Sequence, residues 1–467
     1  FLPGPFHRCN RYCHLPHTND ERDAVKIDPC GCNVAVMFTL VFFIGLLIVL
    51  FLVGIPVCAS IGLTCLAVLW LENDLLSIPI TLLPLKMMHG VNNFPLLAVP
   101  FFILAANVMN KGSVTPRIFG FANSLVGHLR GGLGHVNVLA SMIFAGMSGT
   151  AVADAAGLGA LEIRAMKDQG YPMKYSTGIT GASSVIGPII PPSVAMVIYG
   201  WLSDVSVGGL FIGGLIPGVI LGGALMIMTV VLSYRIAMPL KPRPAFKEIA
   251  GLSKKAFLSL MTPLIIVGGI WSGIFTPTES GAVASIYAII LGTLIFRVFY
   301  WKDLLIIFMR TIEFTAIFLF IISVAGLYGW LLVRLQIPLT LAEGIVQITT
   351  NSTILLIILM FFFLIVGCFM SVIESVLIFT PIMAPMVKAV GVDPLFFGVL
   401  MVISLSVGVI TPPFGNVIYV LVGITHQTFE DVVWALIPFL IPILLTILAL
   451  ILFPELVTYL PNTLIGG

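Results

Sequence analysis

Residues 183–193 read Ser-Ser-Val-Ile-Gly-Pro-Ile-Ile-Pro-Pro-Ser, and residues 404–416 read Ser-Leu-Ser-Val-Gly-Val-Ile-Thr-Pro-Pro-Phe-Gly-Asn. Both stretches interrupt a long apolar run with paired prolines, which cannot continue a helix because proline lacks an N–H and clashes with the preceding turn. In lipid, the freed carbonyls need partners, so such a break persists only where it is buried or lines a polar cavity. Matching breaks in two halves of a membrane protein indicate a transporter binding site near mid-membrane.

The composition is that of a membrane protein. Of 467 residues, 59% are hydrophobic and only 9% are charged, whereas a soluble domain carries about 25% charged residues. The apolar runs do not alternate in polarity, as the strands of a membrane barrel would, so we expect an all-α polytopic fold. The clearest predicted spans are 34–53, 257–275, 282–296, 314–333, 354–373 and 435–453.

Several landmarks recur in the same order. Met147 and Met370, each opening a polar interruption, are 223 residues apart, and the Pro-Pro pairs at 191 and 412 are 221 apart. We therefore predict two homologous halves, 37–232 and 256–467, each with a re-entrant helical hairpin followed by a Pro-Pro-broken helix. The hairpins are expected near 141–165 and 365–388, and the broken helices near 183–193 and 404–416.

A basic linker, 233–255, joins the halves and carries six Lys or Arg residues against one Glu. The positive-inside rule places this linker in the cytoplasm. If each half crosses the membrane an odd number of times, the halves are inverted repeats. Both ends of the membrane portion then face the outside.

The segment 1–36 differs from the rest of the chain because it is polar and contains four of the seven cysteines. Its Cys and His spacing matches no familiar zinc pattern. We interpret it as a segment outside the transporter domain, and we expect its deletion to leave transport intact.

Three acidic residues lie beside polar interruptions. Asp154 sits in an apolar, small-residue stretch, and Glu374 occupies the matching region of the second half. An intramembrane carboxylate is costly and points to a functional site, although a structural carboxylate is the alternative for each. Glu279 follows another proline break and either braces the second site or caps a helix N-terminus.

The oxygen atoms near the breaks suggest ion sites. Na⁺ takes oxygen ligands, as other hard cations do, and unwound backbone at Gly187 and at Gly408 exposes carbonyls. Ser148, Ser183 and Thr411 add hydroxyls. The alternative for each hydroxyl is a bond to its own i−4 carbonyl.

An intramembrane serine protease is a weaker alternative. The residues Gly146-Met-Ser148-Gly149 match a short protease-like pattern, but the serine would need a histidine base. The candidate bases are His89, His128, His135 and His426, all in or beside polar loops. A channel would need a continuous polar lining or rings of charge, which the sequence does not indicate.

The chain also resembles a known family, the large membrane subunit of tripartite ATP-independent periplasmic (TRAP) transporters. The resemblance covers residues from about 37 to the C-terminus. It rests on Phe94-Pro-Leu-Leu-Ala-Val-Pro-Phe-Phe, Gly134-His-Val-Asn-Val, Gly146-Met-Ser-Gly-Thr-Ala-Val-Ala-Asp, Ile186-Gly-Pro-Ile-Ile-Pro-Pro-Ser, Phe275-Thr-Pro-Thr-Glu-Ser and Gly408-Val-Ile-Thr-Pro-Pro.

This resemblance implies the fold of the elevator-type ion transporter superfamily, with Na⁺ as the coupling ion and two or more ions bound. It also implies a small four-helix membrane subunit and a periplasmic substrate-binding protein that delivers an organic acid, such as a C4-dicarboxylate or sialic acid. The predicted Na⁺ ligands are Ser148, Ser183, Gly187, Thr276, Gly408 and Thr411. The predicted substrate-binding residues are Asp154, Pro192, Ser371, Glu374 and Asn416. Ser371 stands where the family pattern leads us to expect an acid.

We therefore predict a Na⁺-coupled subunit that imports an organic acid across the bacterial inner membrane. The alternative is a one-chain Na⁺/carboxylate symporter of the same fold. An enzyme is not expected, because no base is evident beside Ser148. A nucleic-acid-binding protein is not expected either, since the positive residues lie in short loops.

Overall fold

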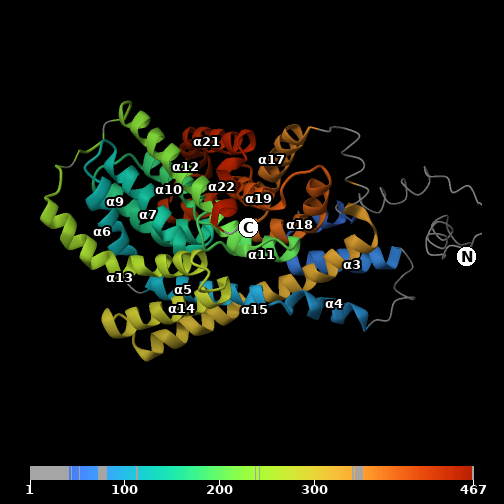
Figure 1. The fold of residues 1–467 in the computed structure, drawn as a ribbon. Coiled ribbons are helices and arrows are strands. Elements are labelled where there is room, and N and C mark those ends of the chain that lie inside the picture. The colour runs from blue at the N-terminus through green and yellow to red at the C-terminus, as the bar shows by residue number, and fades with distance from the viewer. Residues whose placement is uncertain are drawn as a thin grey trace, which may run out of the picture. The chain divides into compact units, whose positions relative to one another are not determined.

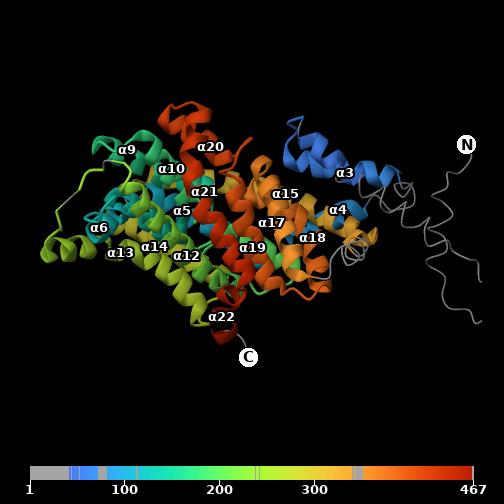
Figure 2. The same ribbon diagram turned by 90° about the horizontal axis from the view of Figure 1, so that it is seen from above.

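The computed structural model describes residues 42–464 except for 44, 52, 72–80, 112–113, 237, 241, 339–340 and 342–350. Figures 1 and 2 show the course of the chain with its main helices labelled. The described residues form helices and turns without any strand, which confirms the all-helical fold class. The polar segment 1–36 and the first part of the predicted span 34–53 lie outside the described residues.

The helices pack into two compact units. The smaller unit comprises the described residues up to Asn92, those within 318–350, and Pro381–Met386; the larger unit comprises Asn93–Ile317, residues 351–380 and the described residues from Val387 onward. Each unit contains residues of both predicted halves. The units therefore reflect packing and do not test the division into halves.

The smaller unit contains α3 (Val57–Leu71), α4 (Leu82–Val91) and the second part of α15 (Trp301–Arg334). Helices α4 and α15 approach closely, because a Cβ added to Gly90 would lie 3.0 Å from the Cα of Gly326. The Ser323 hydroxyl donates to the carbonyl of Met87 at 3.0 Å across the same contact. Small residues thus bring two apolar helices together, as is common in membrane proteins.

The larger unit holds two series of helices. The first consists of η2 (Phe94–Leu97), α5 (Ala98–Lys111), α6 (Val114–Val126), α7 (Gly132–Ser148), α8 (Ala151–Asp154), the π-helix η3 (Ala155–Gly159), α9 (Ala160–Asp168), α10 (Met173–Ser184), α11 (Val194–Ser203) and α12 (Val207–Ser233). The second consists of α13 (Phe246–Trp271), α14 (Pro277–Ile290), the π-helix η4 (Leu291–Ile295), the first part of α15, α17 (Ser352–Phe369), α18 (Val372–Ala389) apart from Pro381–Met386, α19 (Pro394–Gly408), α20 (Asn416–Thr425), α21 (Phe429–Leu452) and α22 (Glu455–Leu464).

The order of elements repeats along the chain. Helix α7 ends at Ser148 and α17 ends at Phe369, an offset of 221 residues. Helices α10 and α19 begin at Met173 and Pro394, again 221 residues apart. In both series a helix, a short break, a returning helix, a helix broken at Pro-Pro and a long helix follow one another. The opposite orientation of the two halves stays a prediction.

Eight of the described helical stretches are long and apolar enough to cross a membrane: Phe94–Lys111, Val207–Ser233, Phe246–Trp271, Pro277–Ile295, Trp301–Arg334, Ser352–Phe369, Val372–Ala389 and Phe429–Leu452. The predicted spans from 257 onward overlap α13, α14 with η4, α15, α17 and α21. The chain is therefore a multi-pass membrane protein.

Within the larger unit, α7 packs against both α10 and α12, as Figure 1 shows. Helix α10 also packs against α21, and α17 against α19. The predicted hairpin near 141–165 falls on the end of α7, on α8 and η3 and on the start of α9. The predicted hairpin near 365–388 falls on the end of α17 and most of α18. These contacts place each hairpin beside the Pro-Pro break of its own half.

Candidate functional site

The first Pro-Pro break joins α10 to α11. Helix α10 ends at Ser184 and α11 begins at Val194, where Ser193 caps the helix by accepting a hydrogen bond from the Met196 N–H at 3.3 Å. All residues between the two helices are buried. The break is therefore enclosed by protein, as unwound backbone in a membrane must be unless it lines a polar cavity.

A buried cluster of polar side chains links α7 to α10 just before this break. The Asn137 amide donates to the Thr180 hydroxyl at 2.7 Å, and the Ser183 hydroxyl donates to the Asn137 side-chain oxygen at 2.6 Å. The Ser141 hydroxyl donates to that of Ser183 at 3.1 Å. The four side chains are at most 2% exposed. This network fixes the position of Ser183, which was predicted as a Na⁺ ligand.

The tip of the first hairpin lies directly against the break. Gly149, between α7 and α8, has φ +64°, and a Cβ added there would lie 2.9 Å from the Pro192 carbonyl oxygen. A Cβ added to Gly187 would lie 3.0 Å from the Thr150 carbonyl oxygen and 3.2 Å from that of Ser184. Glycine at both positions therefore lets backbone carbonyls of the tip and the break come close together.

Ser148 adds a free hydroxyl to this region. Its side-chain oxygen is buried and has no hydrogen-bond partner among the described residues. No histidine base therefore bonds to Ser148 within that part of the chain. An unpartnered buried hydroxyl, next in the chain to a glycine that approaches the Pro192 carbonyl, is an oxygen of the kind that a hard cation takes.

Two carboxylates lie buried in the returning arm of the first hairpin. Asp154, at the end of α8, and Glu162, in α9, are each 1% exposed. Neither carboxylate has a hydrogen-bond partner in the described part of the chain. The side chain of Asp154 has the Ser141 hydroxyl as a neighbour, which connects it to the polar cluster. Asp154 therefore lies beside the predicted ion ligands, as a substrate-coupled or ion-coupled carboxylate would.

The second break joins α19 to α20 and is built differently. Gly408, at the end of α19, meets Gly367 of α17 so closely that a Cβ on Gly367 would lie 2.9 Å from the Gly408 Cα. The Gly415 N–H donates to the Cys368 carbonyl at 2.9 Å. Thr411 is half-buried, whereas residues 412–414 are exposed. The second break thus opens to the surface of the chain, where the first is enclosed.

The hydroxyls of the second break are all bound to their own helix. Ser404, Ser406 and Thr411 donate to the carbonyls four residues earlier at 2.8, 2.6 and 2.8 Å. This is the alternative that the sequence left open for such hydroxyls. Asn416, a predicted substrate residue, begins α20 just after this break.

Ser371 and Glu374 form a reciprocal cap at the start of α18. The Glu374 carboxylate accepts from the Ser371 N–H at 3.1 Å, and the Ser371 hydroxyl accepts from the Glu374 N–H at 3.4 Å. Such a capping box satisfies two N–H groups that the helix leaves free. Both residues therefore have a structural role at the tip of the second hairpin, next to their predicted role in substrate binding.

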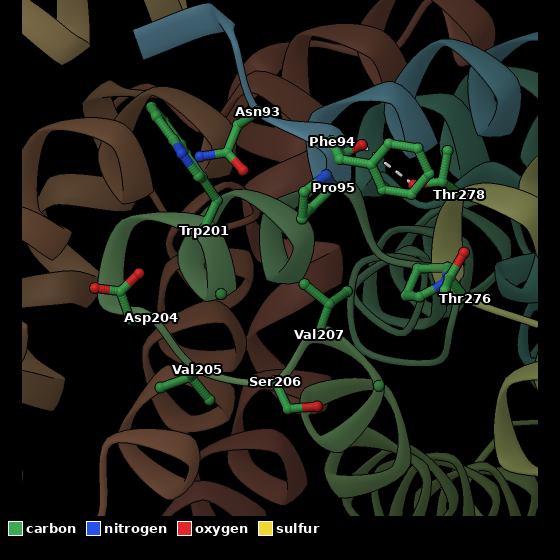
Figure 3. A pocket seen from close by; sticks show the side chains of 13 residues that line it. Asn93, Phe94, Pro95, Trp201, Asp204, Val205, Ser206, Val207, Thr276 and Thr278 are labelled. Carbon is green, nitrogen blue, oxygen red and sulfur yellow. Dashed lines mark hydrogen bonds between the residues drawn. The ribbon is translucent and has the colours of Figure 1, made fainter. Parts of the chain in front are cut away.

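Thr276 and Glu279 form the same kind of cap at the start of α14, with Thr276 N–H donating to Glu279 at 2.8 Å. Capping is the alternative that the structure shows for Glu279. The cap lines a pocket of about 450 Å³ (Figure 3). Thr276 shares this pocket with residues from η2, α11 and the start of α12, and its hydroxyl bonds to Glu279.

Several elements converge on that pocket. Its wall includes Asn93 and Phe94 at the start of η2, Trp201 and Asp204 at the end of α11, and Ser206 at the start of α12. The Thr278 hydroxyl donates to the Phe94 carbonyl at 3.2 Å and ties α14 to η2, as the dashed line in Figure 3 shows. The pocket is thus formed by helix ends, and its wall combines apolar side chains with a few polar ones.

Sequence reasoning did not single out Asn137, Ser141, Thr180 or Glu162. A signal for the first three was present, because Asn137 and Ser141 are four residues apart and Thr180 and Ser183 are three apart, so each pair shares one helix face. For Glu162, the signal was its position four residues after Leu158 and four residues before Met166, which places it on the same helix face as two apolar side chains. The structure shows that both of these side chains are buried. A charged residue on a buried stripe is a functional candidate in a membrane protein.

Comparison with known proteins agrees with the motifs. The chain matches the family described as "Tripartite ATP-independent periplasmic transporter, DctM component" over residues 44–456. It is 40% identical over 413 residues to the sialic acid TRAP transporter large permease protein SiaM of Vibrio cholerae, covering 88% of this chain and 96% of that protein. It is 33% identical over 442 residues to the C4-dicarboxylate TRAP transporter large permease protein DctM of Rhodobacter capsulatus, covering 92% of this chain and 100% of that protein.

The fold is also similar to a solved structure. The crystal structure of the Alcanivorax borkumensis YdaH transporter matches with a TM-score of 0.61 at 15% identity, covering 78% of this chain and 86% of that one. At this identity the likeness concerns the fold alone. The family match over most of the chain and the identity with relatives of nearly the same length lead to one conclusion: this chain belongs to the DctM family, the large permease component of TRAP transporters.

Proposed function

We propose that the chain is the permease subunit of a Na⁺-coupled importer of organic acids. The observation that carries this proposal is the oxygen set at the first break. The unpartnered Ser148 hydroxyl lies in the hairpin whose Thr150 carbonyl approaches Gly187. Ser183 is held nearby by Asn137. Neutral oxygens at a break between half-helices are the ligands by which broken-helix transporters hold Na⁺.

We infer that the substrate is an acid of the sialic acid or C4-dicarboxylate class. The relatives named for these substrates are 40% and 33% identical, which favours sialic acid. The substrate carboxylate would meet the positive ends of α11 and α20, the half-helices that follow the two breaks. Pro192 lies two residues before the start of α11, and Asn416 is the first residue of α20. Asp154 lies in the first hairpin.

The proposal also includes the partner proteins of the chain, its location in the cell and its movement during transport. A small four-helix membrane subunit and a periplasmic binding protein would work with the chain in the bacterial inner membrane. The basic segment 233–255, which leads from the end of α12 into the first turns of α13, supports a cytoplasmic position for that connection. One part of the chain, carrying the two hairpins, would slide as an elevator against a fixed part. The bound ions would favour substrate binding, and the substrate would favour ion binding to the same degree.

The test is reconstitution in vesicles with both partner proteins and labelled sialic acid or succinate. We expect uptake that saturates, requires a Na⁺ gradient and rises with more than the first power of Na⁺ concentration. Uptake that is indifferent to Na⁺ would contradict the coupling. Full uptake by the chain alone would contradict the three-component arrangement and favour a one-chain symporter.

A further inference from the structure

Glu162 is, with Asp154, one of two fully buried carboxylates in the first hairpin. It lies in α9, the last helix of the first hairpin, and is 1% exposed. Both carboxylate oxygens are buried without a hydrogen-bond partner among the described residues. Leu158 and Met166, one turn before and one turn after it, are buried on the same face. Neither the ion ligands nor the substrate contacts proposed above include this residue.

The charges around Glu162 do not neutralise it. Helix α9 packs against η3, α10 and α7. On α10, Lys174 pairs instead with Asp431 at 3.0 Å, and on α7 the His135 ring bonds to the Arg130 carbonyl. Tyr175, also on α10, contacts the rings of Tyr171 and Phe439.

The remaining charged neighbours also fail to compensate the carboxylate. Arg164, Lys167 and Asp168 of α9 itself are exposed. Among the described residues, the charged group that acts on Glu162 is the carboxylate of Asp154, which has the same sign. η3 contains no titratable residue. Ionised Glu162 would thus be buried beside a like charge, which is costly by several kcal/mol.

We propose that Glu162 is a proton-binding site. In the packing seen here the carboxyl holds a proton, and the neutral acid is the form that an apolar enclosure without donors accepts. Helix α9 ends six residues later at Asp168, about 9 Å along the helix axis. Exposed residues 168 and 170 follow at the surface. Any movement of the hairpin that opens this path lets the proton leave to water.

The proton is then a ligand, in addition to the ions and the substrate, whose binding depends on the position of the hairpin. The packed hairpin binds it, an opened hairpin releases it, and external pH shifts the balance between the two. The proton site itself does not depend on Na⁺ coupling. Its consequence for uptake rests on the proposed function, so the two are measured separately.

The direct test is labelling of the full chain in membranes with dicyclohexylcarbodiimide, which adds to protonated carboxyls in apolar surroundings and is located by peptide mass spectrometry. We expect labelling of Glu162 at mildly acidic pH and about a tenfold fall per pH unit above the midpoint, as for a single proton. Glu162→Gln should remove the label. The exposed Asp168, on the same helix, should stay unlabelled, and Asp168→Asn should leave the labelling of Glu162 unchanged.

Three outcomes would overturn the proposal. No labelling at any pH would show an ionised carboxylate. Labelling that is constant from acidic to alkaline pH would show a permanently neutral, structural acid. Labelling prevented by Na⁺ at constant pH would show that the site holds a metal ion and not a proton.

The functional consequence is tested by uptake at several pH values with the partner proteins present. The amide of Glu162→Gln imitates the protonated acid, so this variant should fold and keep Na⁺-dependent uptake while losing most of the pH dependence. Asp168→Asn should keep the pH profile of the unaltered chain. An unchanged pH profile in Glu162→Gln would overturn the coupling to transport, and the labelling result would stand on its own if uptake failed altogether.

Discussion

The two Pro-Pro breaks have the same sequence pattern and a different chemistry. At the first, the Ser183 hydroxyl bonds to Asn137 on another helix as well as to the Thr180 carbonyl of its own helix, and Ser148 has no partner among the described residues. At the second, the hydroxyls of Ser404, Ser406 and Thr411 are bound to carbonyls of their own helix. Under our proposal, Ser148 could therefore bind a cation without losing a hydrogen bond to the described residues, whereas Thr411 would first have to release the Val407 carbonyl.

The acids beside the two hairpins differ in the same way. Asp154 is fully buried and unpartnered, while Glu374 is half-buried and holds the N-terminus of α18. Burying a carboxylate without a partner costs free energy, so such a residue in a membrane protein points to a function. A capping carboxylate already has a structural role. The comparison suggests that the first half contributes most of the ion and substrate chemistry.

The largest expected difference is between Asp154→Asn and Glu374→Gln. Asp154→Asn should reduce uptake about tenfold or more, equivalent to ~1.4 kcal/mol, because it removes the charge beside the ion ligands. Glu374→Gln should keep most uptake, because glutamine also fits a capping box. Uptake in vesicles together with the amount of folded protein in detergent measures both. Normal uptake by a surviving folded fraction of Asp154→Asn would make that residue structural.

A second contrast concerns how tightly the glycine beside each Pro-Pro break is packed. A Cβ on Gly408 would lie 2.8 Å from the Leu364 carbonyl oxygen, and both atoms belong to helices. Gly408→Ala should therefore destabilise the protein by about 1–3 kcal/mol through overpacking. Gly187→Ala, whose added Cβ would meet its nearest neighbour at 3.0 Å, should cost less.

Thermal unfolding in detergent measures this contrast, with Gly423→Ala as the control because nothing lies within 4 Å of its added Cβ. A midpoint for Gly408→Ala equal to that of the control would show that the α17–α19 contact is looser than the structure indicates.

The all-helical fold could be predicted from the sequence, because apolar length and proline positions determine where helices can cross and where they end, although the spans Phe94–Lys111 and Val207–Ser233 were not singled out. The breaks at Pro191-Pro192 and Pro412-Pro413 and the five predicted spans from residue 257 onward correspond to observed elements. The compact units could not be predicted. They depend on close approaches between distant residues, such as Gly90 and Gly326.

The candidate site was predicted as a list of oxygen-bearing residues but not as an arrangement. A sequence does not show whether a hydroxyl bonds only within its own helix, as that of Thr411 does, or also reaches a neighbouring helix, as that of Ser183 does. It also does not show that Thr276 and Ser371 have their hydroxyls engaged in caps. Glu162 could not be singled out from the sequence, because α9 also carries other charged residues. Only the packing of this helix distinguishes the buried acid from the exposed charged residues.

A third prediction compares Ser148→Ala with Thr411→Val. Removing the Ser148 hydroxyl should leave stability unchanged or slightly raised, because a buried polar group without a partner is lost. It should raise the Na⁺ concentration for half-maximal uptake several-fold, about what the loss of ~1 kcal/mol predicts. Thr411→Val should change it less. Sodium titration of uptake decides this, and a larger effect of Thr411→Val would reverse the ranking of the two sites.

The smallest expected effect is at the cap of the second hairpin. Ser371→Ala removes the hydroxyl that accepts from the Glu374 N–H, so α18 should lose about 1 kcal/mol of stability. If capping is the whole role of Ser371, the maximal uptake rate and the substrate concentration for half-maximal uptake should stay unchanged in the folded protein. Glu374→Gln serves as the matched variant, since it retains the cap and changes only the charge. Weaker substrate binding in Ser371→Ala with unaltered stability would instead assign the hydroxyl to the substrate, and the second hairpin would then contribute to recognition as the first is proposed to do.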